Sequence, residues 1–238
     1  MKNNIIAIDV SKEYQYYVDK LIERTKREIY EWFNHPTIED KVNVYIYKDI
    51  PSLIEGLKRR GLGPYPDYMV ACMVDEDESK GIRRSINFYE PSKTPKENEY
   101  TKKEYNNVIL HELIHYITDI LYGKLPEWLT EGIAKYLDGS YKTDLTALMH
   151  QYIATYEIPD VSTMKENKFI VRENEKTIYD GYDLSYIMVR YIIEVYGKEE
   201  LFSLMKNKKQ LKQIEQQVLT EAIEYFNSQY PKENTIKK

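Results

Sequence analysis

The sequence predicts an α+β protein, with a small mixed sheet and helices in its first lobe and an all-helical second lobe. Strands are predicted only before residue 91, and helical periodicity prevails after residue 101. The chain has 238 residues, of which 42% are hydrophobic and 31% charged, so it is globular in composition and can bury a core. We expect one domain over 1–230, with lobes at 1–124 and 125–230 and a disordered tail at 231–238.

Helices and strands are predicted to alternate in the first lobe. In chain order they are a helix over 11–33, a strand over 41–48, a helix over 49–60 and a hairpin of two strands over 68–74 and 82–90. Ser11 predicts the N-cap of the first helix, and Gly61 ends the second. Val42, Val44 and Ile46 alternate with other residues, which indicates a strand with one buried face.

The remainder of the chain is predicted to be helical apart from a polar, extended stretch that ends near residue 178. The helices are expected at 101–121, 126–137, 140–157, 182–197, 198–206 and 210–228. Pro126 opens the second of these helices, and Gly123 and Gly197 end the first and the fourth.

Composition excludes several classes of protein. The net charge of -5 gives no basic footprint for nucleic acid, and no window approaches 18 apolar residues, so we expect neither a nucleic-acid partner nor a membrane span. The apolar run at Ile5–Ile8 is too short for a signal peptide, which predicts a cytoplasmic location for the chain as written and leaves a removed leader open. Cys72 is the single cysteine and is expected to be a buried small hydrophobe.

The stretch His111-Glu112-Leu113-Ile114-His115 has the pattern H-E-x-x-H. Residues four apart share one face of a helix, so both imidazoles can reach one ion. Zinc accepts nitrogen and carboxylate ligands and keeps one position for water in catalytic sites, and Glu112 is placed to take a proton from that water. The competing interpretation is a pair of hydrogen-bonded core histidines that match the pattern by chance.

Three acidic residues, Asp119, Glu127 and Glu131, compete for the place of a third ligand. Asp119 follows His115 by four residues on the same helix, which fits a role in orienting that helix or a ligand. Glu127 is a first-turn glutamate, which is common because of the helix dipole. Glu131 lies one turn deeper in an apolar stretch and is followed by Gly132 and Ala134, which we expect to let the two helices approach closely. These features favour Glu131.

The motifs resemble those of the gluzincins, zinc peptidases with a glutamate as third ligand, and most closely the peptidase MA-like family. That family has an H-E-x-x-H helix, a W-L-x-E-G-x-A helix and a later helix of the form Y-x-x-S-x-x-x-V-x-Y that ends in YG. Here these are HELIH, WLTEGIA and the segment 182–197. Outside 109–137 and 182–197, the likeness is limited to the coarse α/β pattern of the first lobe.

The resemblance implies a zincin-like fold with a zinc cleft between the two lobes. It implies that His111, His115 and Glu131 bind one zinc ion per chain and that Glu112 is the catalytic acid and base. A tyrosine hydroxyl would donate a hydrogen bond to the oxyanion of the reaction intermediate.

Tyr182 best matches the tyrosine of the family motif, and Tyr179 and Tyr186 are nearby competitors. The competing interpretation of Tyr182 is packing at the start of a helix.

Two further features bear on the site. Some gluzincins carry an aspartate four residues after the glutamate ligand, where this chain has Lys135. A lysine cannot accept the imidazole proton, so Asp119, Asp138 or a backbone carbonyl would have to do so. Related peptidases bind extended substrate along an edge strand, and we assign this role to residues 84–88, unless they form an ordinary central strand.

The sequence therefore predicts a zinc metallopeptidase whose partner is a peptide or protein substrate. One alternative is a catalytically silent, peptidase-like binding module that keeps its zinc, although such a module has no need of Glu112. Another is a helical interaction protein with core histidines and no metal. Neither the substrate nor the oligomeric state is predicted.

Overall fold

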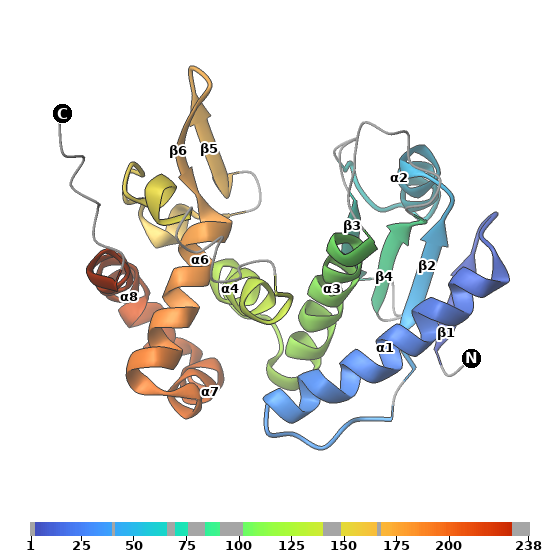
Figure 1. The fold of residues 1–238 in the computed structure, drawn as a ribbon, viewed down its shortest axis with the longest axis horizontal. Helices are drawn as coiled ribbons and strands as arrows, with labels where there is room; N and C mark the ends of the chain where they lie inside the picture. Colours follow the sequence, from blue (N-terminus) through green and yellow to red (C-terminus); the bar gives the residue numbers. More distant parts are fainter. Residues whose placement is uncertain are drawn as a thin grey trace, which may run out of the picture. The chain divides into compact units, whose positions relative to one another are not determined.

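The computed structural model describes residues 3–39, 41–65, 70–75, 84–90, 102–139, 149–165 and 168–229. The chain divides into two compact units, Met1–Ile120 and Leu121–Lys238. Figure 1 shows the elements of each unit along the chain. No helix in the described part of the chain combines the length and hydropathy that a membrane span requires.

The first unit contains a mixed four-stranded sheet in the order β1-β2-β4-β3. Its strands are β1 (Asn4–Ala7), β2 (Asn43–Tyr47), β3 (Ala71–Asp75) and β4 (Arg84–Tyr89). β1, β2 and β4 are parallel, and β3 is antiparallel to β4. The predicted pairing of the last two strands is confirmed, whereas β1 was not predicted because its apolar run is only four residues long.

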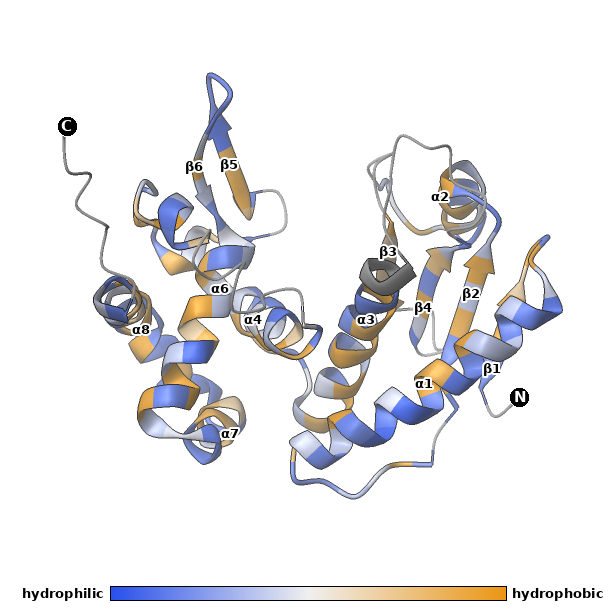
Figure 2. Ribbon diagram, viewed as in Figure 1, coloured by the Kyte–Doolittle hydropathy of each residue, from blue (hydrophilic) through white to orange (hydrophobic). Residues whose placement is uncertain are grey.

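Two predictions about these strands are wrong. Residues 84–88 do not form an edge strand, because β4 pairs with β2 on one side and with β3 on the other. β2 is not half-buried, because Tyr45 and Tyr47 are only 8% and 1% exposed. The helix α2 (Ile50–Arg59) covers that face, where Gly56 packs against the ring of Tyr47. Figure 2 shows β2 as largely hydrophobic.

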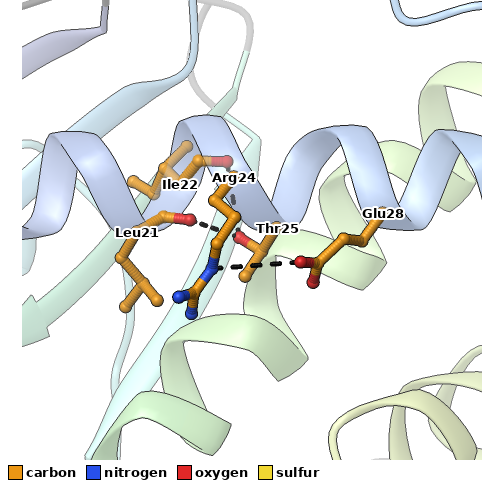
Figure 3. A network of polar contacts seen from close by, with 5 residues as sticks. All are labelled: Leu21, Ile22, Arg24, Thr25 and Glu28. Carbon is orange, nitrogen blue, oxygen red and sulfur yellow. Dashed lines mark hydrogen bonds and ion pairs between the residues drawn. The ribbon is translucent and has the colours of Figure 1, made fainter.

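The helices α1 (Lys12–Trp32) and α3 (Lys102–Tyr122) complete the predicted elements of the first unit. Ser11 caps α1, as predicted, by accepting a hydrogen bond from the backbone N–H of Tyr14. α1 buries an apolar stripe but also Thr25, whose hydroxyl donates to the carbonyl oxygen of Leu21 at 2.7 Å (Figure 3). A buried hydroxyl is thereby satisfied within its own helix.

The second unit is built around α4 and α6. Its described elements are α4 (Glu127–Leu137), the 3-10 turn η3 (Val161–Thr163), β5 (Ile170–Glu173), β6 (Lys176–Asp180), α6 (Gly181–Tyr191), the π-helical turn η5 (Ile192–Tyr196), α7 (Lys198–Lys206) and α8 (Lys208–Gln229). Of the helix expected at 140–157, residues 149–153 are helical and 140–148 lie outside the described residues. The tail expected at 231–238 also lies outside them.

The prediction of an all-helical second lobe is wrong. β5 and β6 pair in an antiparallel hairpin that projects from the N-terminal end of α6 (Figure 1). Its turn residues, Asn174 and Glu175, both have positive φ, at 47° and 65°. Two consecutive residues with positive φ are typical of the two-residue turn of a β-hairpin. Such turns usually contain glycine, and this one does not, so the sequence predicts the hairpin only weakly.

Candidate metal centre

The helix α3 carries the two histidines of the H-E-x-x-H pattern. Their ring centroids are 4.6 Å apart, and the ring planes meet at 83°. Leu113, Ile114 and Ile117 are fully buried, whereas both histidines are half-buried. The helix therefore presents both imidazoles away from its apolar face, one turn from each other, as the spacing predicts.

Glu131 joins the two histidines in one cluster. A nitrogen of His111, a nitrogen of His115 and a carboxylate oxygen of Glu131 all lie within 4.8 Å of one another. Two imidazoles and one carboxylate form a donor set that zinc binds, and a fourth position is left for water. The described residues therefore fit the ion that the sequence predicts. Neither Asp119 nor Glu127 belongs to this cluster.

The position of Glu131 depends on the packing of α4 against α6. A Cβ atom added at Gly132 would lie 2.3 Å from the backbone oxygen of Ser185 and 2.6 Å from Cγ2 of Val189. Gly132 therefore permits close contact with α6, and the expectation that it serves the approach to the motif helix is wrong.

Glu112 lies beside His111 on α3 and is half-buried. The pKa of the Cys72 thiol on β3 is raised, mainly by burial and to a smaller extent by the negative charge of Glu112. The charge of Arg60 opposes this effect without reversing it. Cys72 is therefore a protonated thiol, consistent with the predicted small hydrophobe, although its side chain is half-buried rather than fully buried.

The three candidate tyrosines lie in different surroundings. The hydroxyl of Tyr179 donates to the carbonyl oxygen of Lys168 at 2.7 Å, so it already has a structural partner. Tyr186 is 6% exposed and its ring lies against that of Tyr136. Tyr182 is half-buried at the N-terminal end of α6. Of the three, Tyr182 is the most exposed.

Tyr182 is also connected to the helix that carries Glu131. The ammonium of Lys135, one turn after Glu131 on α4, lies 5.4 Å from the centroid of the Tyr182 ring. One turn back along α4, Gly132 contacts Ser185 of α6. The two helices therefore pack against each other, with Lys135 beside the first turn of α6 and Gly132 beside Ser185.

The remaining acidic residues near the motif have other contacts. Asp119 forms an ion pair with Arg84 of β4, which agrees with its expected role in orienting the helix. Glu127 stands in the first turn of α4, where the helix dipole favours a carboxylate. Asp138 is 3% exposed at the C-terminal end of α4.

Comparison with known proteins identifies the family. The family profile described as the Peptidase MA superfamily matches residues 98–227, which is more than half of the chain and spans α3, α4 and α6. No curated protein matches the chain. The match covers all three motifs on which the resemblance was based, and the chain therefore belongs to the peptidase MA superfamily, in the gluzincin clan.

Proposed function

We propose that this protein is a zinc-dependent metallopeptidase that hydrolyses peptide bonds. His111, His115 and Glu131 would hold one zinc ion per chain, and Glu112 would act as general base. The observation that supports this proposal best is the convergence of three ligand atoms within 4.8 Å in a chain of the peptidase MA superfamily. That convergence joins a residue of α4 to the H-E-x-x-H pair on α3, which chance matching of the pattern does not explain.

Zinc bound there would supply a Lewis acid that polarises a carbonyl and lowers the pKa of water. Glu112 accepts a proton from the attacking water and then passes it to the leaving nitrogen, so that the amine departs neutral. Tyr182 donates a hydrogen bond to the oxygen on which negative charge develops. Five residues would thus take part in the reaction: three bind the ion, one transfers the proton and one stabilises the negative charge.

An extended peptide would bind by adding a strand to the sheet of the first unit. The strand for this role is β3, because in the described sheet it pairs only with β4, and β4 itself is paired on both sides.

The test combines metal analysis with cleavage of an unbiased peptide library. Wild type is expected to contain about one zinc per chain and to cleave peptides. His111→Ala should lose the metal, whereas His35→Ala, which changes an exposed histidine, should keep it. Undiminished zinc in His111→Ala would overturn the ligand assignment.

The same assay separates metal binding from catalysis. Glu112→Gln should keep its zinc and lose cleavage by at least about 100-fold, because the general base is removed and the ligands are not. Glu127→Gln serves as the matched control and should keep both. A wild-type protein that binds zinc and cleaves nothing would instead favour the catalytically silent binding module.

A further inference from the structure

Lys135 stands where some gluzincins carry an aspartate, and its surroundings indicate a different role. It lies one turn after Glu131, so the two side chains share a face of α4. Its ammonium lies 5.4 Å from the centroid of the Tyr182 ring. Cations within about 6 Å of an aromatic centroid are attracted to the electron-rich face of the ring.

We propose that Lys135 is a positioning residue for Tyr182: its ammonium fixes the phenol ring and polarises its hydroxyl. The inference rests on the proposed function, in which Tyr182 donates a hydrogen bond to the developing oxyanion. A cation on the ring face draws electron density from the phenol oxygen, so the hydroxyl becomes a stronger donor. An aspartate that orients a histidine is thus replaced by a lysine that acts on the tyrosine.

Tyr182 is held in place from two other directions. The Phe169 ring packs against it in a T-shaped arrangement, with centroids 4.8 Å apart and planes at 77°. Its backbone N–H donates to Oδ1 of Asp180 at 2.8 Å, which caps α6. Gly181 between them donates to the carbonyl oxygen of Phe169 at 2.7 Å. The backbone is therefore fixed, and the contacts to the ring set where the hydroxyl points.

The charge of Lys135 reaches the cap as well. Burial and the neighbouring Asp183 raise the pKa of Asp180, and Lys135 partly offsets this rise. The ammonium therefore favours the ionised carboxylate that accepts the backbone N–H of Tyr182. Both influences of Lys135, on the ring and on the cap, act on the same residue.

The first test is independent of activity and of metal. 3-Fluorotyrosine placed at residue 182 reports the surroundings of the ring by fluorine NMR. Lys135→Met should shift this resonance, and Lys135→Arg should largely restore it, because a guanidinium also binds the face of a ring. Lys198→Met is the matched control, since its ammonium lies 5.6 Å from the centroid of Phe202 in the same unit, and it should leave the resonance unchanged. An unchanged resonance in Lys135→Met would overturn the proposal.

The second test is a double-mutant cycle on peptide cleavage. Lys135→Met should lower kcat about tenfold with little change in KM. In a Tyr182→Phe background the same change should alter kcat by less than about twofold, because the hydroxyl through which it acts is gone. Equal losses in both backgrounds would overturn the proposal and assign Lys135 a direct contact with substrate. A wild-type protein that cleaves no peptide would contradict only the proposed function. The fluorine NMR experiment would still test whether Lys135 acts on the Tyr182 ring.

Discussion

Arg84 of β4 forms an ion pair with Asp119 of α3, four residues after His115. The pair joins a central strand to the helix that carries both histidines. Tyr47 faces α2 and pairs with Tyr89 of β4, so Tyr89 lies on the same face of the sheet. Side chains alternate between the two faces along a strand, and Arg84 is five residues from Tyr89, so it lies on the opposite face. α2 and α3 therefore cover opposite faces of the sheet. The motif helix is therefore attached to the sheet by a charge pair one turn from His115.

Removal of this pair should destabilise the first unit. Arg84→Met is expected to lower the free energy of unfolding by about 1 kcal/mol, because the side chains are only 27% and 17% exposed. Arg24→Met is the matched control: Arg24 and Glu28 are 3.9 Å apart on α1 and are 71% and 65% exposed (Figure 3), so the cost should be close to zero. Urea unfolding measures both, and equal losses would contradict the role of the Arg84 pair.

Gly132 should not tolerate a side chain. Gly132→Ala would bring its methyl group into the backbone of Ser185, which α4 and α6 can accommodate only by moving apart. Overpacking of this kind costs about 1–3 kcal/mol, although alanine is otherwise the better helix former. Thermal unfolding should show the loss, and zinc content should fall with it if the spacing of α4 positions Glu131. A more stable Gly132→Ala protein would refute the close contact.

Of the three candidate tyrosines, only Tyr182 is expected to contribute to turnover. Tyr182→Phe should lower kcat by about 100-fold and leave KM nearly unchanged, as expected when a donor to the oxyanion is removed. Tyr179→Phe removes a structural hydrogen bond to Lys168, so it should cost about 1 kcal/mol of stability and leave kcat unchanged. The reverse pattern would transfer the role to Tyr179.

The charge of Asp180 should make stability depend on pH in an unusual direction. Burial and then the charge of Asp183 raise the pKa of Asp180 in the folded protein. A raised folded pKa means that its contribution to stability is present below the usual aspartate pKa and is lost as the pH rises through the folded pKa. Asp180→Asn keeps the N-cap and never ionises, so it should be more stable than wild type at pH 7. The difference should disappear in acid.

Asp160 provides a control of opposite sign. Its side chain caps η3, and its hydrogen bonds with Ser162 lower its pKa. Its contribution is therefore present above the usual aspartate pKa and is lost as the pH falls through the folded pKa. Asp160→Asn should be less stable than wild type at pH 7 and equal to it in acid. Chemical unfolding at several pH values measures both variants, and the same sign for both would contradict these assignments.

Local chemistry let the sequence predict much of the fold. The helices α1, α2, α3, α4, α7 and α8 lie close to their expected bounds, because their caps and apolar spacing are set by neighbouring residues. The spacing of His111 and His115 likewise placed both imidazoles on one face of α3 without any knowledge of the rest of the chain. The choice of Glu131 over Glu127 followed from the apolar stretch around it and agrees with the cluster.

Long-range packing decided the rest. β4 is a central strand because β2 pairs with it in parallel, and β1 is a strand because it pairs with the other side of β2. Neither pairing can be predicted from the residues next to these strands in the sequence. Gly132 contacts α6, and Lys135 lies over Tyr182, because α4 and α6 pack along their lengths. The sequence by itself determined that His111 and His115 share one face of a helix, because that spacing is local. Only the tertiary structure decided which neighbours they have, because contacts between distant segments depend on how whole helices and strands bury their apolar faces.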